Sequence, residues 1–207
     1  MTQKPHSRPK AVSDHKRELI LDAAKQVFAE EGLEGASLRA IAVRAGYTPA
    51  ALYFHFESKE DIYAEVLSAS LGSLGAAVAD AVHRTRAPQQ RLRAAAMSFF
   101  RFYADNPRDL DLGFYLFRGG MKRAGLGRDR DERLNAELEA ALRPIAEAAI
   151  ALGASRPKAN LLMVDCFAHA TGLLLLLHTG RIRMFDASAP DLMERFVKGQ
   201  IAHLLEG

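Results

Sequence analysis

Apolar residues recur along most of this chain at intervals of three and four positions, which is the spacing of one face of an α-helix. The first such stripe begins after Ser13 or Asp14 and ends at Gly32. Its members are Leu19, Ile20, Ala23, Ala24, Val27 and Phe28. Nowhere does alternation of apolar and polar positions coincide with β-branched residues, so we predict no strand. The pattern therefore predicts an all-α fold with about nine helices.

Two short helical segments follow the first stripe. Ser37 precedes the first segment, which Gly46 ends. Thr48 precedes the second, which carries Pro49 in its first turn, where the missing N–H of proline costs nothing. The order helix, helix, glycine turn, helix is that of the helix-turn-helix, whose last helix lies in the major groove of DNA. We therefore predict a helix-turn-helix DNA-binding domain over residues 14–57.

Helical periodicity continues through the rest of the chain. A fourth helix, capped by Ser58, is predicted to run to about Arg84. Further helices are expected at 88–103, 108–117, 129–152, 157–179 and 190–205. Residues 118–129 are rich in glycine and basic residues and are predicted to form a loop, and Pro144 either bends or interrupts its helix. Residues 58–207 would then form a C-terminal helical domain.

The first 13 residues lack helical periodicity and contain Pro5 and Pro9, so they are predicted to form a flexible basic arm. Through Arg17 the chain carries five lysines or arginines against one acidic residue, a larger local excess than the formal charge of +3 of all 207 residues. Such an arm is either a solvated tail or an electrostatic contact for an anionic polymer.

Composition narrows the class of protein. The chain is 49% hydrophobic and 26% charged, which is typical of a globular protein. Its one cysteine, Cys166, cannot form an intrachain disulfide, and the sequence opens with polar and basic residues, so we predict a cytoplasmic location. Asp165 and His169 interrupt the longest apolar run, which is shorter than the ~20 residues of a membrane span. We predict no membrane partner.

No motif for catalysis or for a cofactor is recognisable. The chain has no nucleophile elbow and no metalloprotease motif. The segment GGMKRAGLG at 119–127 lacks the spacing of a phosphate-binding loop and follows no predicted strand. We therefore predict that the protein is not an enzyme and uses no cofactor.

The third helical segment has the residues that a helix in a DNA groove needs. Small residues open it, at Pro49, Ala50 and Ala51. Donors suited to phosphate oxygens are Thr48, Tyr53, His55 and Lys59. Leu52 and Phe56 are four positions apart, so both are predicted to face inward and dock the helix on its neighbours.

The stretch SLRAIAVRAGYTPAALYFHFESKEDIY resembles the tetracycline-repressor (TetR) family of bacterial transcriptional regulators. The resemblance covers about residues 14–67 and implies DNA-backbone contacts by Ser37, Thr48, Tyr53, His55 and Lys59. It implies contacts with bases or flanking sugars by Arg39, Tyr47, Pro49, Ala50 and Phe54. It also implies that the N-terminal DNA-binding domain, called the head below, has a core of Leu38, Ile41, Ala42, Leu52 and Phe56. The alternatives are a head that only packs, a Tyr47 that only fills the turn and an Arg39 that is only solvated.

The sequence departs from the family's pattern in two respects. Ser37 stands where threonine is usual, which preserves the cap and the hydroxyl. The third helical segment, which would be the recognition helix in the major groove, has no Gln, Asn, Arg or Lys at its first positions. It therefore cannot make bidentate hydrogen bonds to bases there. Specificity would then depend on Arg39, Thr48, contacts of Ala50 or Ala51 with thymine methyl groups, and DNA shape.

The C-terminal domain contains far more apolar residues than DNA reading requires. The resemblance implies that it dimerises and binds a small-molecule effector. The five leucines at 173–177 face every side of their helix, as expected when one side meets the core and another meets a partner. We therefore predict a homodimer through the helices at 157–179 and 190–205, arranged as a four-helix bundle. A monomer with a buried core helix is the alternative.

An effector pocket is predicted where aromatic and sulfur-containing side chains gather. Its members are Met97, Phe100, Phe114, Tyr115, Phe117, Met121, Cys166 and His169, each of which is otherwise plain core. Asp165, Cys166 and His169 have the spacing of metal ligands, but no second cluster completes four ligands, and we predict no metal.

We predict a repressor that an effector releases from a palindromic operator. A helical ligand-binding or small-molecule-modifying protein with a purely structural head is the alternative.

Overall fold

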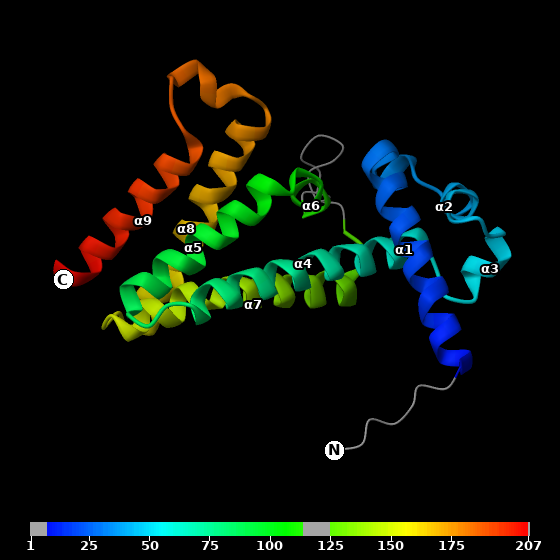
Figure 1. Cartoon of the computed structure of the whole chain (residues 1–207), viewed down its shortest axis with the longest axis horizontal. Coiled ribbons are helices and arrows are strands. Elements are labelled where there is room, and N and C mark those ends of the chain that lie inside the picture. Colours follow the sequence, from blue (N-terminus) through cyan, green and yellow to red (C-terminus); the bar gives the residue numbers. More distant parts are fainter. Residues whose placement is uncertain (1–7, 114–124, 207) are drawn as a thin grey trace. The chain divides into compact units, whose positions relative to one another are not determined.

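The computed structural model describes residues 8–113 and 125–206. Within those ranges it contains nine α-helices, one short 3₁₀-helix and no strand, which confirms the all-α prediction. The α-helices are α1 (Arg8–Gly35), α2 (Leu38–Ala45), α3 (Pro49–Tyr53), α4 (Lys59–His83), α5 (Pro88–Asp105), α6 (Pro107–Gly113), α7 (Arg128–Ala151), α8 (Arg156–His178) and α9 (Ala189–Glu206). The 3₁₀-helix η2 (Arg181–Phe185), which the sequence did not predict, lies between α8 and α9 (Figure 1).

Helix α1 begins earlier than predicted. The expected start was Ser13 or Asp14, but the helix begins at Arg8 and has Pro9 in its first turn, where no amide donor is needed. Residues 8–13 are therefore helical and not part of a flexible arm. The rest of the predicted arm, residues 1–7, lies outside the described residues. Near the other end Gly32 breaks the helical geometry, with φ 70° and ψ 178°, at the position where the sequence predicted an end.

The later helices lie close to their predicted bounds. Ser58 caps α4, because its hydroxyl oxygen accepts a hydrogen bond of 3.1 Å from the amide of Asp61. Helix α7 continues through Pro144, so the proline does not divide it. The C-terminal part of the helix predicted at 108–117, and most of the loop predicted at 118–129, lie outside the described residues.

Contacts divide the chain into two compact units. The first comprises the described residues of 1–69 and 111–131, and the second those of 70–110 and 132–207. The start of α4 therefore groups with the head by contacts, whereas the sequence-based division assigned all of α4 to the C-terminal domain. The functional division at residue 57 stays a prediction.

The first unit is built around α1, α2, α3 and the start of α4. Helix α1 packs on α2, and α2 packs on α3 (Figure 1). The rings of Phe28 and Tyr63 meet edge to face, with centroids 4.8 Å apart, and the Tyr63 hydroxyl donates a hydrogen bond of 2.8 Å to the carbonyl of Leu112. Ile41 is fully buried in this core. These contacts give the short helices α2 and α3 a fixed base.

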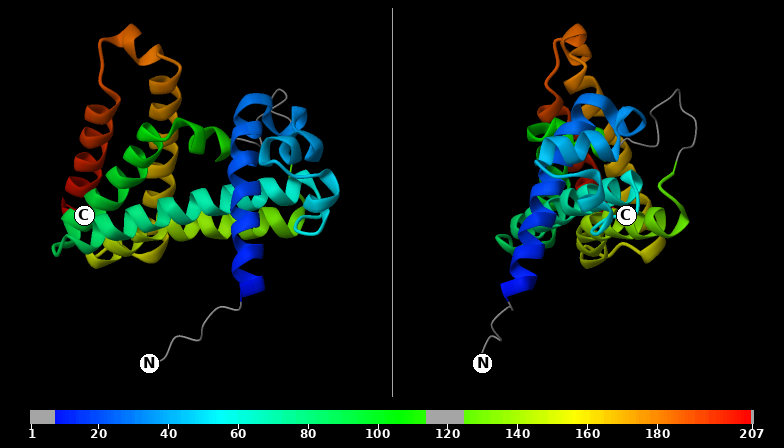
Figure 2. Two further views of the ribbon diagram at one scale, coloured as in Figure 1. Left: turned by 45° about the vertical axis from the view of Figure 1, so that its right-hand side comes forward. Right: turned by 90° about the vertical axis from the view of Figure 1, so that its right-hand side faces the viewer.

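The second unit is built around α5, α8 and α9, which pack against one another in pairs. Phe99 on α5 meets Phe167 on α8, with ring centroids 5.8 Å apart. Arg93 on α5 donates a hydrogen bond of 2.6 Å to Glu194 on α9, and this bond lowers the pKa of the Glu194 carboxyl group. Helices α8 and α9 run antiparallel, with η2 in the turn that joins them (Figure 2).

Helices α4 and α8 are long and apolar enough to cross a membrane by length and composition alone. The apolar window is 50% buried in α4 and only 28% buried in α8. Leu173 and Leu174 are buried, while Leu175 is 53% exposed. Helix α8 therefore buries one side in its unit and leaves a second apolar side uncovered.

Candidate nucleic-acid interface

Hydroxyl side chains and one glycine fix the two helices of the motif. Ser37 caps α2, because its Oγ accepts a hydrogen bond of 3.1 Å from the amide of Ala40. Gly46 ends α2 in the left-handed conformation, with φ 75° and ψ 26°, which a residue with a Cβ adopts only with strain. Thr48 caps α3, with its Oγ1 3.3 Å from the amide nitrogen of Ala51. The caps and the turn therefore occupy the positions that the sequence predicted.

Capping leaves Ser37 and Thr48 able to donate. In each cap the hydroxyl oxygen accepts a hydrogen bond through a lone pair, so its own proton remains available to a second acceptor. Both side chains are exposed. A phosphate oxygen beside either helix N-terminus would meet a hydroxyl donor and the positive end of the helix dipole.

The outer and inner sides of α3 differ sharply. Leu52 is 0% and Phe56 2% exposed, which confirms their predicted docking role, whereas Tyr53 is 62% and Phe54 88% exposed. Thr48, Pro49 and Ala50 are exposed as well. Large aromatic side chains that are exposed to solvent next to small residues indicate a binding surface.

Two hollows collect most of the predicted DNA contacts. One, of about 270 Å³, lies beside α3 and brings together Tyr47, Phe54 and His55, with Lys16 from α1. The second, of about 530 Å³, is lined by four more of the predicted contacts: Ser37, Arg39, Tyr53 and Lys59. Thr48, Pro49 and Ala50 line neither hollow and lie on the exposed first turn of α3.

The two arginines of α2 have different surroundings. Arg44 is bound by Glu30, with a shortest distance of 2.7 Å, and by Gln26, and its pKa is raised by the hydrogen bond to Glu30 and then by that residue's charge. Arg39 is exposed and has no ion pair or hydrogen bond with any described residue. Arg39 is therefore the arginine of α2 that is free to reach a base or a phosphate.

Lys59 binds backbone carbonyl groups within the protein, which the sequence did not reveal. Its ammonium group donates to the carbonyl oxygens of Leu33, Glu34 and Ala36 at 2.9, 3.3 and 3.2 Å. An ammonium group has three protons, so these three acceptors can take all of them. Lys59 thus joins the start of α4 to the end of α1, and its contact with phosphate stays a prediction.

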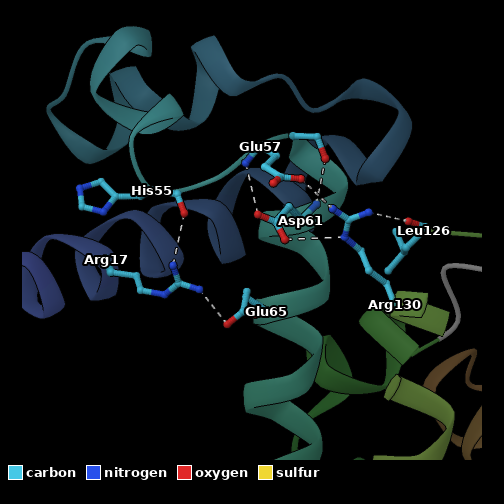
Figure 3. A network of polar contacts seen from close by, with 8 residues as sticks. Arg17, His55, Glu57, Asp61, Glu65, Leu126 and Arg130 are labelled. Carbon is cyan, nitrogen blue, oxygen red and sulfur yellow. Dashed lines mark hydrogen bonds and ion pairs between the residues drawn. The ribbon is translucent and has the colours of Figure 1, made fainter. Parts of the chain in front are cut away.

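Sequence reasoning missed Arg17, whose guanidinium group reaches the segment after α3. Arg17 donates a hydrogen bond of 3.3 Å to the backbone carbonyl of His55 and lies 3.0 Å from the carboxylate of Glu65 (Figure 3). The sequence contains an indication of this role, because Arg17 precedes Ile20 and Ala24 by three and seven positions. A charged residue on the apolar side of a helix points to a specific partner.

Only four of the eight predicted effector residues are among the described residues. Phe114, Tyr115, Phe117 and Met121 lie outside those residues. Met97 and Phe100 are buried on α5. A groove of about 480 Å³ between α4 and α5 is lined by Met97 but by neither Phe100, Cys166 nor His169. The location of an effector pocket stays a prediction.

Cys166 is buried in the core of the second unit, and His169, three positions later on α8, is half-buried. Burial, with a smaller effect from Asp165, raises the pKa of the Cys166 thiol to about 12, so the thiol is protonated and a poor nucleophile. His169 stacks on Phe196 with ring centroids 4.0 Å apart, and burial lowers its pKa. Within the described ranges no three His, Cys, Asp or Glu side chains are placed to hold a metal ion.

Residues 20–66 match the family model for bacterial regulatory proteins of the tetR family. The chain is 40% identical over 89 residues to the HTH-type transcriptional activator FasR of Mycolicibacterium smegmatis, covering 43% of this chain and 41% of that protein. It is 36% identical over 105 residues to the HTH-type transcriptional repressor BepR of Brucella suis, covering 51% of this chain and 41% of that protein. The chain thus spans about two fifths of the length of these relatives.

Other similarities extend over most of the chain. The HTH-type transcriptional repressor NicS of Pseudomonas putida is 26% identical over 194 residues, which cover 90% of this chain and 86% of that protein. A solved transcriptional regulator from Pseudomonas aeruginosa has a TM-score of 0.70 at 20% identity, covering 94% of this chain and 92% of its own. The regulator FadR of Bacillus subtilis, solved with stearoyl-CoA, has a TM-score of 0.67 at 16% identity, covering 92% and 98%. At these identities the two structures establish the fold.

Proposed function

We propose that this chain, whose N-terminal domain places it in the tetR family of bacterial regulatory proteins, is a sequence-specific DNA-binding transcriptional regulator. It acts in the cytoplasm as a homodimeric repressor whose two heads occupy successive major grooves of a palindromic operator. Half-sites would then lie about 34–36 Å apart, one turn of DNA. A small-molecule effector bound to the C-terminal domain releases it.

The outer side of α3 is the observation that carries this proposal. Tyr53 and Phe54 project into solvent from a helix whose other side, through Leu52, is completely buried. A purely structural head would have no reason to keep these aromatics in water. The capping hydroxyls of Ser37 and Thr48 lie beside this face, as does Arg39, which has no partner in the described part of the chain. All three supply donors for phosphates and bases.

The uncovered side of α8 supports the homodimer. Exposed apolar and small residues recur along it at intervals of three and four, at Leu161, Val164, Ala168, Gly172 and Leu175. Leu161 is 65% exposed, Val164 54% and Leu175 53%. An apolar stripe of this length is suited to pairing with the same stripe of a second copy about a two-fold axis, together with α9.

An effector can release the protein from its operator only if it binds the free and the operator-bound protein with different affinities. An effector that favours a separation of the heads unlike that of the operator complex would weaken operator binding by its differential affinity, typically ~1–3 kcal/mol. An effector that binds free and operator-bound protein equally would contradict this mechanism. Equilibrium binding of the same compound with and without operator distinguishes the two cases.

Selection from a pool of random duplexes tests the function directly. The expected result is a palindrome with two half-sites one turn or slightly more apart, bound with an affinity that falls steeply as salt rises, because neutralised phosphates regain their counterions. Weak binding without sequence preference would reject the proposal and favour a ligand-binding protein whose head is structural.

Replacing Tyr53 with phenylalanine is expected to weaken binding to every duplex, by about tenfold, because a lost phosphate contact carries no sequence information. Tyr53 is 62% exposed, so the variant should keep the stability of the parent. The measurement is affinity for the selected palindrome and for a scrambled duplex. Unchanged affinity for both would remove Tyr53 from the interface.

Replacing Arg39 with alanine is expected to act at particular base pairs. The preferred base at those positions should lose ~1–3 kcal/mol of discrimination if the contact is bidentate. Repeating the selection with the variant and comparing base preferences position by position measures this. A uniform loss over all sequences would instead make Arg39 a backbone contact.

A further inference from the structure

We infer that Arg17 is a positioning residue that fixes the orientation of the recognition helix by holding the segment between α3 and α4. This inference rests on the proposed DNA-binding function. Arg17 belongs to α1 and would not itself read DNA. Its role would be to present α3 to the major groove at one angle.

One guanidinium group makes three separate contacts. Nη1 donates to the His55 carbonyl at 3.3 Å, and Nη2 lies 3.0 Å from a carboxylate oxygen of Glu65 on α4. The central carbon of the guanidinium lies 4.5 Å from the centre of the Phe56 ring. Figure 3 shows the side chain reaching from α1 to both partners, while the His55 ring points away from it. Arg17 therefore joins α1, the end of the recognition helix and α4.

Helix α3 depends on such anchors because it is short. It has 5 residues, and helices below ~12–15 residues are marginal without tertiary contacts. Thr48 fixes its beginning and Leu52 its middle. Beyond its end, the carbonyl of Leu52 accepts from the amides of His55 and Phe56, at 2.8 and 2.9 Å. The next fixed point along the chain is the carbonyl of His55, which Arg17 holds.

Arginine is suited to this task in a way that lysine is not. A guanidinium group is flat, so its edge can donate to two acceptors in one plane while its face lies on an aromatic ring. An ammonium group is a compact charge that cannot make both kinds of contact in fixed directions. The charge of Arg17 is also paired with Glu65, and its side chain is only 38% exposed.

Arg130 holds the other side of the same segment in a looser way. Its guanidinium lies 3.6 Å from Asp61 and 3.8 Å from Glu57, and Asp61 accepts a hydrogen bond of 3.2 Å from the Glu57 amide (Figure 3). These contacts involve side chains at the start of α4. Arg17, in contrast, donates a hydrogen bond directly to the backbone that follows α3, at the carbonyl of His55.

The test uses the full chain and a duplex that carries the palindrome selected by the parent protein. Arg17→Met keeps an apolar stem over Phe56 but removes the charge and the donors, and Arg17→Lys keeps the charge alone. Lys25→Met is the matched control, because Lys25 is also a cation of α1 that pairs with a carboxylate, Asp22 at 3.4 Å, without contacting α3. All binding is measured at a temperature where circular dichroism shows every variant to be fully folded.

Arg17→Met is expected to bind the palindrome about tenfold more weakly while its binding to a scrambled duplex changes less than twofold, roughly the effect of losing one charge-assisted contact. The slope of log affinity against log salt should stay that of the parent, since no phosphate contact is lost. Peptides covering residues 52–58 should exchange amide hydrogens faster. Arg17→Lys should recover only part of the affinity, and Lys25→Met should bind like the parent.

Three results would overturn the inference. Parent-like affinity of Arg17→Met would show that the orientation of α3 does not depend on this side chain. Equal loss on both duplexes, with a salt slope smaller by about one counterion, would make Arg17 a phosphate contact. Full recovery by Arg17→Lys would show that charge alone is needed. If the parent selects no duplex, the proposed function itself fails, whatever hydrogen exchange shows for residues 52–58.

Discussion

Replacing Phe56 with alanine is expected to lower the free energy of unfolding by about 3–5 kcal/mol and to abolish operator binding at ordinary concentrations. Phe56 is 2% exposed, so the substitution leaves a cavity among tightly packed side chains of the head. It also removes the ring beneath the guanidinium of Arg17. Urea denaturation followed by circular dichroism measures the stability, and titration of a labelled duplex measures the binding.

Phe54→Ala is the matched control, because it removes the same side chain two positions earlier. Phe54 is 88% exposed, so its stability should change by less than about 0.5 kcal/mol. Its operator binding should nevertheless weaken, since Phe54 lies on the face proposed to meet DNA. Equal destabilisation by the two substitutions would contradict the division of α3 into a buried and a presented side.

Placing aspartate at both Leu161 and Val164 is expected to raise the dissociation constant of the dimer by at least about 100-fold. Each carboxylate would be buried without a partner in the proposed interface, which costs several kcal/mol, and every 1.4 kcal/mol is a factor of ten. In the isolated chain both positions are exposed, at 65% and 54%, so the protomer itself should fold normally. Sedimentation velocity over a concentration series measures the dissociation constant.

Val43→Asp provides the complementary control for the dimer. Val43 is 71% exposed on α2 in the first unit and should leave the dimer unchanged. The α8 double variant should also lose affinity for the full palindrome, because a monomer can occupy only one half-site. A double variant that stays dimeric at the same concentrations as the parent would rule out this side of α8 as the interface.

The parts of the head that the sequence predicted are those that local rules govern. Ser37 and Thr48 cap their helices and Gly46 adopts the left-handed conformation because each requirement involves only neighbouring residues. The inward positions of Leu52 and Phe56 follow from helical spacing. The partners of Arg17 and Lys59 were missed because they lie 38 and up to 26 positions away in the chain.

The second unit was harder to predict. The aromatic and sulfur-containing side chains of α5 and α8 have the composition of a pocket, and among the described ones Phe100 and Cys166 are buried, as both a core and an enclosed pocket would require. Composition does not distinguish these outcomes, because pockets and cores are lined by the same apolar residue types. The uncovered stripe of α8 likewise became evident only when the burial of each leucine was known.

The sequence by itself determined the all-helical class, the positions of most helices and the helix-turn-helix motif, because periodicity, caps and turn residues act over a few positions of the chain. The tertiary structure alone decided which charged side chains are free and which are engaged. Arg39 has no hydrogen-bond or ion-pair partner among residues 8–113 and 125–206, whereas Arg44, Lys59 and Arg17 are bound by residues of other segments, and such pairings depend on segments that meet only after folding. The same dependence on distant segments decided which side of α8 remained uncovered.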